Sequence, residues 1–296
     1  MEQSEERHPR PLAWALLILL TIVWGSSFIL IKKGLLVYSA QQVASIRILS
    51  ASLFMIPFAW SWMRRIKSKY FGLIFVSGFI GSFIPAFFFA IAQTRLDSAV
   101  TGMVNAMTPV FVLVIGVLFY RQKITTFMVL GLLLAVGGTV LLMYYGSDSE
   151  HRFNLYALFI VGATILYGIN VNILKFNLAA LNPVAISSIS IAFVGPFAAA
   201  TLFGFSDFTD RLLHSDGAVL ALVYLSILGI VGTSLALILF NFLIKKTTPL
   251  FASSVTYLIP MVAVFWGIVD GEQLYIAHYV SMMLIILGVF LANRRY

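Results

Sequence analysis

Ten apolar runs of about 20 residues follow one another along the 296-residue chain. That length crosses a bilayer as an α-helix. The apolar residues within each run are continuous and do not alternate with polar ones, which favours helices over barrel strands. Short polar or charged segments separate the runs, which lie at about 12–31, 39–62, 70–91, 98–120, 125–145, 154–173, 183–203, 218–243, 249–269 and 274–292. The pattern predicts an all-α integral membrane protein with ten transmembrane helices.

Part of this pattern occurs twice. Residues 104–137 correspond to residues 255–288 at an offset of 151 positions. The identities pair Pro109 with Pro260, Gly116 with Gly267, Gln122 with Gln273, Val129 with Val280 and Gly137 with Gly288. Each copy also keeps small or weakly polar residues within an arc of roughly 60° on one helix, namely Gly102, Asn105, Pro109 and Gly116 in the first and Ser253, Thr256, Pro260 and Gly267 in the second. Such a stripe on an apolar helix predicts a face directed at the protein interior.

The repeat extends toward the start of each half at an offset of 143. Its polar, glycine and aliphatic identities pair Thr21, Ile22, Gly25, Lys32, Ser45, Ile46 and Ile48 with Thr164, Ile165, Gly168, Lys175, Ser188, Ile189 and Ile191. The chain therefore divides into five-helix repeats at 12–145 and 154–292, with a linker at 146–153 and tails at 1–11 and 293–296. Because five is odd, the second repeat enters the membrane from the opposite side, which makes an inverted repeat suited to alternating access.

Charge supports this topology and orients it. The chain is 61% hydrophobic and 10% charged, and it has no cysteine for disulfides or metal thiolates. With the amino terminus inside, thirteen lysines and arginines fall in inner segments and five in outer loops. This bias predicts a multi-pass protein of the plasma membrane, the inner membrane of a bacterium, with both termini in the cytoplasm. It also explains the net charge of +8 without a nucleic-acid partner.

An aromatic residue flanked by hydrogen-bonding groups recurs at mid-span in both halves. Thr21, Trp24 and Ser27 share one face of the first helix, and their counterparts are Thr164, Tyr167 and Asn170. Trp and Tyr usually lie at the membrane interface, whereas Trp24 and Tyr167 lie deep in their spans. We interpret the two groups as the walls of a substrate cavity where the repeats meet; the alternative is ordinary helix packing.

Pro109 and Pro260 are predicted hinges. Each proline lacks an N–H and clashes with the preceding turn, so it frees the carbonyl four residues back, on Asn105 and Thr256. In lipid, a freed carbonyl needs a partner from protein, water or ligand. The symmetry of the two prolines favours cavity lining or hinges over two tolerated kinks.

Arg47 places a cation about nine residues inside the second span. An intramembrane charge is costly and is by default a functional candidate; snorkelling to an interface is the alternative. If Arg47 faces the cavity, it can hold a carboxylate or phosphate. The same logic gives further candidates for substrate binding in Asn241 and Tyr257, and weaker ones in Gln93 and Asn172.

Acidic residues occur only near span ends or in loops, so the sequence shows no carboxylate relay for proton or sodium coupling. The four histidines are terminal or near loops, and no metalloprotease, nucleophile-elbow or nucleotide-binding motif is present. We therefore expect no catalytic residues, no cofactor and no bound metal.

These residues resemble the EamA family of the drug/metabolite transporter superfamily. The matching pieces are Trp24-Gly25-Ser26-Ser27-Phe28, Arg47, and Pro109-Val110-Phe111 followed by Gly116. The resemblance covers nearly the whole chain and implies ten helices, cytoplasmic termini, and export or exchange of small metabolites, including amino acids, through a central cavity. The second half departs from the motif, with Tyr167-Gly168-Ile169-Asn170 in place of the first.

The leading hypothesis is a secondary transporter, an exporter or exchanger, of a small metabolite such as an amino acid. Its partners are that substrate and membrane lipids, and the small-residue stripes fit either a monomer interior or a homodimer face. A non-transporting scaffold or lipid-carrier accessory subunit is the alternative from another class. An intramembrane enzyme needs a clustered acid–base pair that the sequence lacks.

Overall fold

The structure, a computed structural model, describes residues 11–121, 125–145, 154–247, 252 and 255–292. The predicted tail residues 1–10 and 293–296, the linker 146–153 and most of 249–254 lie outside the described residues. Throughout the described part the regular structure is helical. The all-α prediction is therefore confirmed.

The first half contributes five spans, and several consist of more than one helical segment. Their elements are α1 (Pro11–Gly25) and α2 (Ser27–Leu35); α3 (Ala40–Met63); η1 (Ser68–Tyr70), α4 (Phe71–Gly78), η2 (Phe79–Phe83) and α5 (Ile84–Ala92); α6 (Ser98–Asn105) and α7 (Thr108–Tyr120); and α8 (Thr126–Tyr145).

The second half repeats this order. Its elements are α9 (Ala157–Phe176); α10 (Pro183–Ala199) and η3 (Ala200–Gly204); α11 (Phe208–His214), a short connecting helix; α12 (Ala218–Gly229), η4 (Ile230–Leu235) and α13 (Ala236–Lys246); α15 (Val255–Val269); and α16 (Ile276–Ala292). Eight spans are long and apolar enough to cross a membrane, and α15 and α16 supply two shorter apolar helices. The ten-helix prediction is confirmed.

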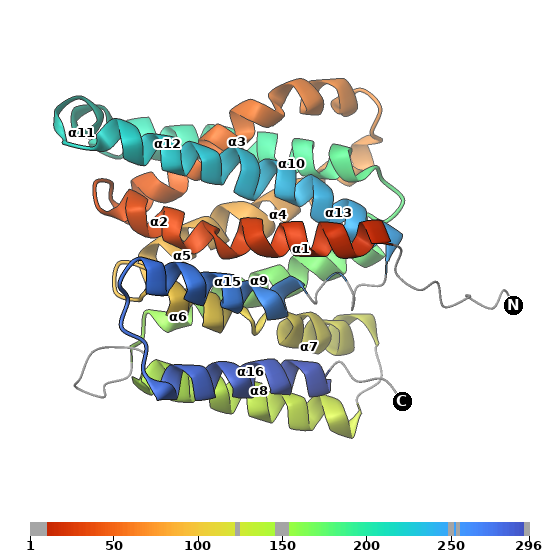
Figure 1. Ribbon diagram of the computed structural model, residues 1–296. Helices are drawn as coiled ribbons and strands as arrows, with labels where there is room; N and C mark the ends of the chain where they lie inside the picture. The colour runs from red at the N-terminus through yellow and green to blue at the C-terminus, as the bar shows by residue number, and fades with distance from the viewer. Residues whose placement is uncertain (1–10, 122–124, 146–153, 248–251, 253–254, 293–296) are drawn as a thin grey trace, which may run out of the picture.

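The packing of the spans is reciprocal between the halves. Counterpart helices pack on each other, α3 on α10 and α8 on α16, and the α8–α16 pair forms one edge of the bundle (Figure 1). A first span also packs on the other half's fourth span in both directions, α1 on α15 and α9 on α7. The helices α1 and α16 respectively begin and end at the same end of the bundle (Figure 1). Reciprocal pairing of two five-span units is what an inverted repeat produces.

Two π-helical segments also occupy equivalent places. The segments η2 and η4 interrupt the third span of each half, and Phe79 and Ile230 at their starts are related by the offset of 151. A π segment adds a residue to one turn and commonly lies at a functional site. Both segments border the cavity described below.

The first span extends farther than the sequence indicated. Hydropathy ended it near residue 31, but α2 continues to Leu35 and carries Lys32 and Lys33 in its last turn. Cations are favourable at a helix carboxyl end, and here carboxylates neutralise them. Lys32 pairs with Asp270 and Glu272, both at 2.8 Å, and Lys33 pairs with Asp270.

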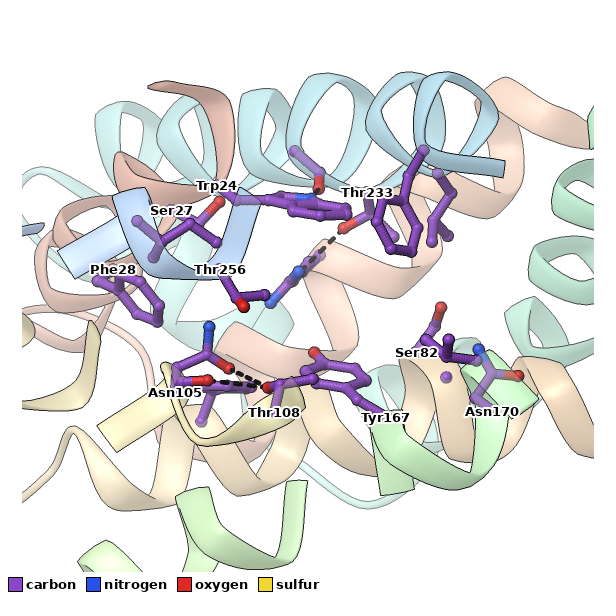
Figure 2. A pocket seen from close by; sticks show the side chains of 18 of the residues that line it. Trp24, Ser27, Phe28, Ser82, Asn105, Thr108, Tyr167, Asn170, Thr233 and Thr256 are labelled. Carbon is purple, nitrogen blue, oxygen red and sulfur yellow. Dashed lines mark hydrogen bonds between the residues drawn. The ribbon is translucent and has the colours of Figure 1, made fainter. Parts of the chain in front are cut away.

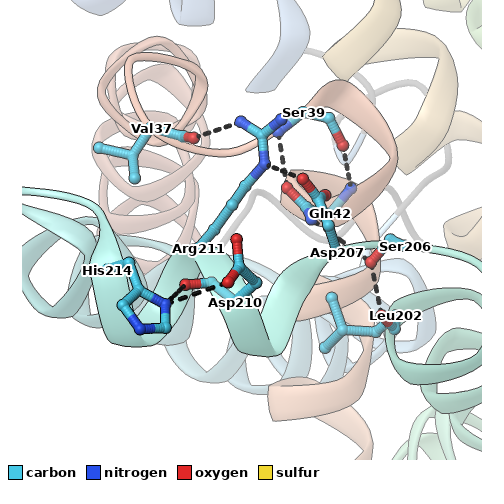
Figure 3. Close-up of polar contacts among 9 residues, drawn as sticks. All are labelled: Val37, Ser39, Gln42, Leu202, Ser206, Asp207, Asp210, Arg211 and His214. Atoms are coloured by element: carbon cyan, nitrogen blue, oxygen red, sulfur yellow. Dashed lines mark hydrogen bonds and ion pairs between the residues drawn. The ribbon is translucent and has the colours of Figure 1, made fainter.

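Polar contacts at the same end tie the turn after α2 to α11 (Figure 3). Ser39 and Gln42 form a capping box at the start of α3. Gln42 Nε2 donates to Asp207 Oδ1 at 2.7 Å, Arg211 Nε donates to Asp207 Oδ2 at 2.8 Å, and Arg211 Nη1 donates to the Val37 carbonyl at 3.0 Å. The hydrogen bond from Arg211 lowers the pKa of Asp207. This end of the bundle is thus held by charged and polar contacts between the two halves.

Candidate functional site

A cavity of about 120 Å³ lies between the two halves. A cavity needs about 10–15 Å³ to hold a single water, so this one has room for several. Its lining comes from both repeats and combines aromatic rings with hydroxyl and amide groups (Figure 2). The lining residues are Trp24, Ser27, Phe28, Ile31, Arg47, Gly81, Ser82, Phe89, Asn105, Thr108, Tyr167, Asn170, Val171, Leu174, Gly232, Thr233, Leu237, Phe240, Thr256 and Ile259.

Two aromatic pairs form matching walls of the cavity. Trp24 meets Phe240 edge-on with ring centroids 5.0 Å apart, and Tyr167 stacks with Phe89 at 6.1 Å. Each pair joins the first span of one half to the third span of the other. Trp24 Nε1 also donates to the carbonyl of Gly232 at 3.0 Å, which fixes the indole against η4. Both walls therefore present fixed apolar surface to the cavity.

Ser27 and Asn170 lie one helical turn beyond the two aromatic residues. The Ser27 hydroxyl donates back to the Val23 carbonyl at 3.1 Å, and Asn170 Oδ1 accepts from Ser77 at 2.6 Å. The π segments pack closely against these two side chains. A Cβ added to Gly232 would lie 3.2 Å from the Ser27 hydroxyl, and a Cβ added to Gly81 would overlap the Asn170 amide. Glycine at both bulges leaves the room that the polar side chains occupy.

Arg47, on α3, reaches the cavity from one side. Its Nε donates to the Thr233 hydroxyl at 2.9 Å, the bond drawn at Thr233 in Figure 2. Thr233 in turn donates to the Leu228 carbonyl at 3.3 Å, so its oxygen lone pairs face the guanidinium. The π turn of η4 positions this hydroxyl, because Thr233 lies within it.

The fourth span is broken where Pro109 predicts a hinge. The helix α6 ends at Asn105 and α7 starts at Thr108, with Pro109 in the first turn of α7. The carbonyl of Asn105, predicted to be freed, accepts a hydrogen bond from the Thr108 hydroxyl at 2.8 Å. In the second half α15 runs unbroken through Pro260, so the two predicted hinges differ in form.

Seven of the nine predicted binding residues line the cavity, and two do not. Those that line it are Trp24, Ser27, Arg47, Asn105, Tyr167, Asn170 and Thr256. Asn241 is buried away from the cavity and donates to Ser187 at 2.8 Å. Tyr257 is half-buried and packs against the hydrophobic core. The weaker candidates Gln93 and Asn172 are also buried outside the cavity lining.

Several lining residues were missed by sequence reasoning. Phe89 and Phe240 are equivalent at the offset of 151, as are Ser82 and Thr233. Applying the same offset to the third span of each half would have identified these residues. Hydropathy alone would not, because phenylalanine is abundant in every span and its face cannot be assigned.

The lining chemistry bears on the reactions open to the site. Among the described residues that line the cavity there is neither a carboxylate nor a histidine. No group of three histidine, aspartate or glutamate side chains in the described part of the chain is placed to hold a metal ion. The described site offers binding groups and one cation.

Comparisons with known proteins agree with this architecture. Residues 12–144 and 154–294 each match the sequence profile of the EamA-like transporter family. An uncharacterized transporter of Archaeoglobus fulgidus is 26% identical over 285 residues, spanning 95% of this chain and 99% of that protein. A probable terminal-alkyne amino-acid exporter of Streptantibioticus cattleyicolor is 22% identical over 95% of this chain and 93% of its own.

Further similarities extend over comparable lengths. A WAT1-related protein of Arabidopsis thaliana is 21% identical over 95% of this chain and 88% of that protein. A protein of known crystal structure superimposes over 96% of both chains with a TM-score of 0.61 at 15% identity. That structural likeness supports the fold alone.

Proposed function

The chain belongs to the EamA-like transporter family, and from this premise we propose that it is a secondary transporter of a small metabolite such as an amino acid. The substrate binds in the cavity between the halves and is exposed to each side of the membrane in turn. The observation that carries the proposal is the reciprocal construction of the cavity: each half supplies one ring to each aromatic pair, a polar residue on its first span and a π-helical bulge. Two near-equivalent packings of one fold are the usual basis of alternating access.

Each lining residue has a role in this proposal. Trp24 and Tyr167 pack against the apolar body of the substrate, and Arg47 supplies charge. Hydrogen bonds to the substrate come from Ser27, Asn105, Asn170 and Thr256. Asn241 and Tyr257 have no direct binding role, because they do not border the cavity.

The prolines and π segments allow the halves to rock. The break between α6 and α7 leaves Ala106 and Met107 outside both helices, beside Pro109. A π-helical turn contains one residue more than an α-helical turn. Conversion of one into the other lets a span change its register locally. We propose that Pro109 and the paired π segments absorb the motion, with Pro260 acting within a continuous helix.

The direction we propose is export or exchange across the plasma membrane, with both termini in the cytoplasm. A relative described as a probable amino-acid exporter supports this direction and this substrate class. The thirteen-to-five distribution of lysine and arginine supports the orientation.

Flux into proteoliposomes tests the proposal. We expect the purified chain to catalyse uptake of some labelled amino acids, measured with and without a pH gradient. Trp24→Ala should lower the rate by about tenfold, because it removes a wall of the cavity and a hydrogen bond to η4. Trp60→Ala is the control, since Trp60 is 65% exposed on the outside of the bundle.

The outcomes separate the hypotheses. Unchanged flux in Trp24→Ala at equal levels of folded protein would count against the cavity. Absence of flux for every compound, together with a partner that co-purifies at fixed stoichiometry, would favour the scaffold alternative.

A further inference from the structure

We propose that the compound carried by this protein bears a single carboxylate, that Arg47 binds this carboxylate, and that the compound has no net positive charge. The inference rests on the proposed function, since it names the substrate class for the same cavity. An ammonium group on the substrate is tolerated in this scheme but not required.

The charge of the lining is the first argument. Of the described residues that border the cavity, Arg47 is the one with a charged side chain. No ion pair joins it to a carboxylate in the described part of the chain. A cation held among apolar helices without a counter-ion is unfavourable. A bound anion would neutralise it, and a cationic compound would be repelled.

The geometry of the guanidinium is the second argument. A guanidinium has five N–H donors in a planar fork, and Arg47 uses its Nε on Thr233. No described residue accepts a hydrogen bond from the Nη atoms. Thr233 is fixed by its own bond to the Leu228 carbonyl, so Nε is anchored while the outer edge of the fork stays available. A carboxylate is the group that this edge binds with two parallel hydrogen bonds.

The number of cations selects carboxylate over phosphate. A phosphate monoester carries about −1.5 to −2 charges near neutral pH, whereas the described lining supplies one positive charge. A single carboxylate balances that charge. The rings of Trp24, Phe240, Tyr167 and Phe89 then enclose the apolar part of the compound.

The described lining has no acidic side chain, and this determines whether the substrate needs an ammonium group. An essential ammonium group would require a carboxylate partner to offset the free-energy cost of its desolvation. The cavity offers oxygen acceptors on Asn105, Thr256 and Ser82 instead. These neutral groups accommodate an ammonium or leave it out, so removing the amine from an amino acid preserves binding while removing the carboxylate abolishes it.

Ligand-dependent thermal stability of the purified full-length chain in nanodiscs tests this preference without measuring flux. The probes share a phenyl ring: phenylalanine, 3-phenylpropanoate, 2-phenylethylamine, 3-phenylpropanamide and phenyl phosphate. We expect the two carboxylates to raise the unfolding midpoint. The amine and the amide should leave it unchanged, and the phosphate should act more weakly than the carboxylates.

Variants assign the effect to Arg47. Arg47→Gln should weaken the apparent affinity for 3-phenylpropanoate by about 10- to 100-fold, because it removes a charge-assisted hydrogen-bond pair. Arg47→Lys keeps the charge but loses the fork, so its affinity should be intermediate. Arg64→Gln is the matched control, since Arg64 is exposed and contacts the Trp60 ring outside the cavity.

Four results would overturn the proposal: stabilisation by the amine as large as that by the carboxylates, equal or stronger stabilisation by phenyl phosphate, unchanged affinity in Arg47→Gln, or no stabilisation by either carboxylate. If Arg47→Gln does not fold, the proposal is tested by the affinity of Arg47→Lys and by the probe selectivity of the unaltered chain. Selective carboxylate binding without flux would leave Arg47 as a carboxylate-binding residue and refute transport. Flux of amines alone would support transport and refute the carboxylate preference.

Discussion

Gly168 lies where α9 crosses α7, and a side chain there would force a shift in the packing of the two helices. A Cβ at this position would lie 2.8 Å from the backbone carbonyl carbon of Phe111 and 3.0 Å from its oxygen. Its counterpart Gly25 meets the side chain of Val262 on α15, and Phe111 and Val262 are equivalent at the offset of 151. Both first spans therefore rely on glycine to approach the fourth span of the other half.

Gly168→Ala should destabilise the protein. Backbone atoms of Phe111 cannot move aside as a flexible side chain can, so the helices must separate, at a cost of about 1–3 kcal/mol. We expect the apparent Tm of the purified protein to fall by several degrees. Gly137→Ala is the control, because a Cβ on Gly137 meets nothing within 4 Å and alanine favours the helix by about 1 kcal/mol. Equal changes in both variants would refute the close contact.

At the residue scale, repetition predicts the cavity better than hydropathy does. Trp24, Ser27, Tyr167 and Asn170 could be selected because an aromatic or polar character recurred at a fixed offset. Asn241 was selected from polarity alone, and it hydrogen-bonds Ser187 instead of facing the cavity. An isolated polar residue in a membrane helix satisfies its hydrogen bonds with any neighbour, so polarity alone does not identify the site.

At the scale of elements, the two ends of the bundle differ in charge. Glu272 joins three segments: it pairs with Lys32 of α2 and accepts hydrogen bonds from the Ser98 and Ala99 backbone N–H groups at the start of α6. By the repeat offsets, Lys32 corresponds to Lys175 and Glu272 to Arg121, so the opposite end carries two cations at the equivalent places. Lys175 and Arg121 therefore cannot pair with each other as Lys32 and Glu272 do.

Breaking the ion pairs of Lys32 with Asp270 and Glu272 should open the cavity at that end of the bundle. In a background with the single reporter Ile259→Cys, available because the chain has no native cysteine, Lys32→Gln removes the ion pairs to Asp270 and Glu272. We expect a water-soluble maleimide to modify the reporter about fivefold faster, as a loss of about 1 kcal/mol implies. Lys69→Gln, at the other end, is the control. An unchanged rate in Lys32→Gln would show that the ion pairs do not hold this end closed.

The same link predicts a response to acid. Hydrogen bonds from Lys32 and Lys33 lower the pKa of Asp270. Burial alone would raise the pKa of Glu272, but hydrogen bonds from Lys32, Ser98 and Ala99 outweigh it and the pKa is lowered. A carboxylate with a lowered folded-state pKa stabilises the fold above its unfolded pKa of about 4 and loses that effect as the pH falls through the folded value.

Thermal stability measured against pH checks this sign. These two carboxylates should give a Tm that is level from about pH 8 to pH 5 and falls below about pH 4. Glu272→Gln should have a lower Tm at neutral pH and a shallower acid-dependent fall, because its side chain does not titrate. A parallel fall in both proteins would assign the acid response to other groups.

At the scale of the whole molecule, hydropathy and repetition predicted the ten helices and their arrangement as two inverted repeats. They did not predict the π segments η2 and η4, since in a uniformly apolar span an extra residue in one turn leaves the hydropathy unchanged. The extension of α2 was missed for a related reason: Lys32 and Lys33 look like loop residues until Asp270 and Glu272 are brought beside them by the fold.

The inverted repeat makes one further prediction that the absence of native cysteine allows to be tested cleanly. Leu36 follows α2 and is 74% exposed, and Ala179 follows α9 and is also exposed. The two positions are equivalent at the offset of 143, so an axis in the membrane plane puts them on opposite sides. In intact cells, a membrane-impermeant maleimide should label Leu36→Cys. Ala179→Cys should react only after permeabilisation, because the lysine and arginine bias puts it in the cytoplasm. Labelling of both positions from one side would rule out the inversion, and with it the exchange of two equivalent packings on which alternating access depends.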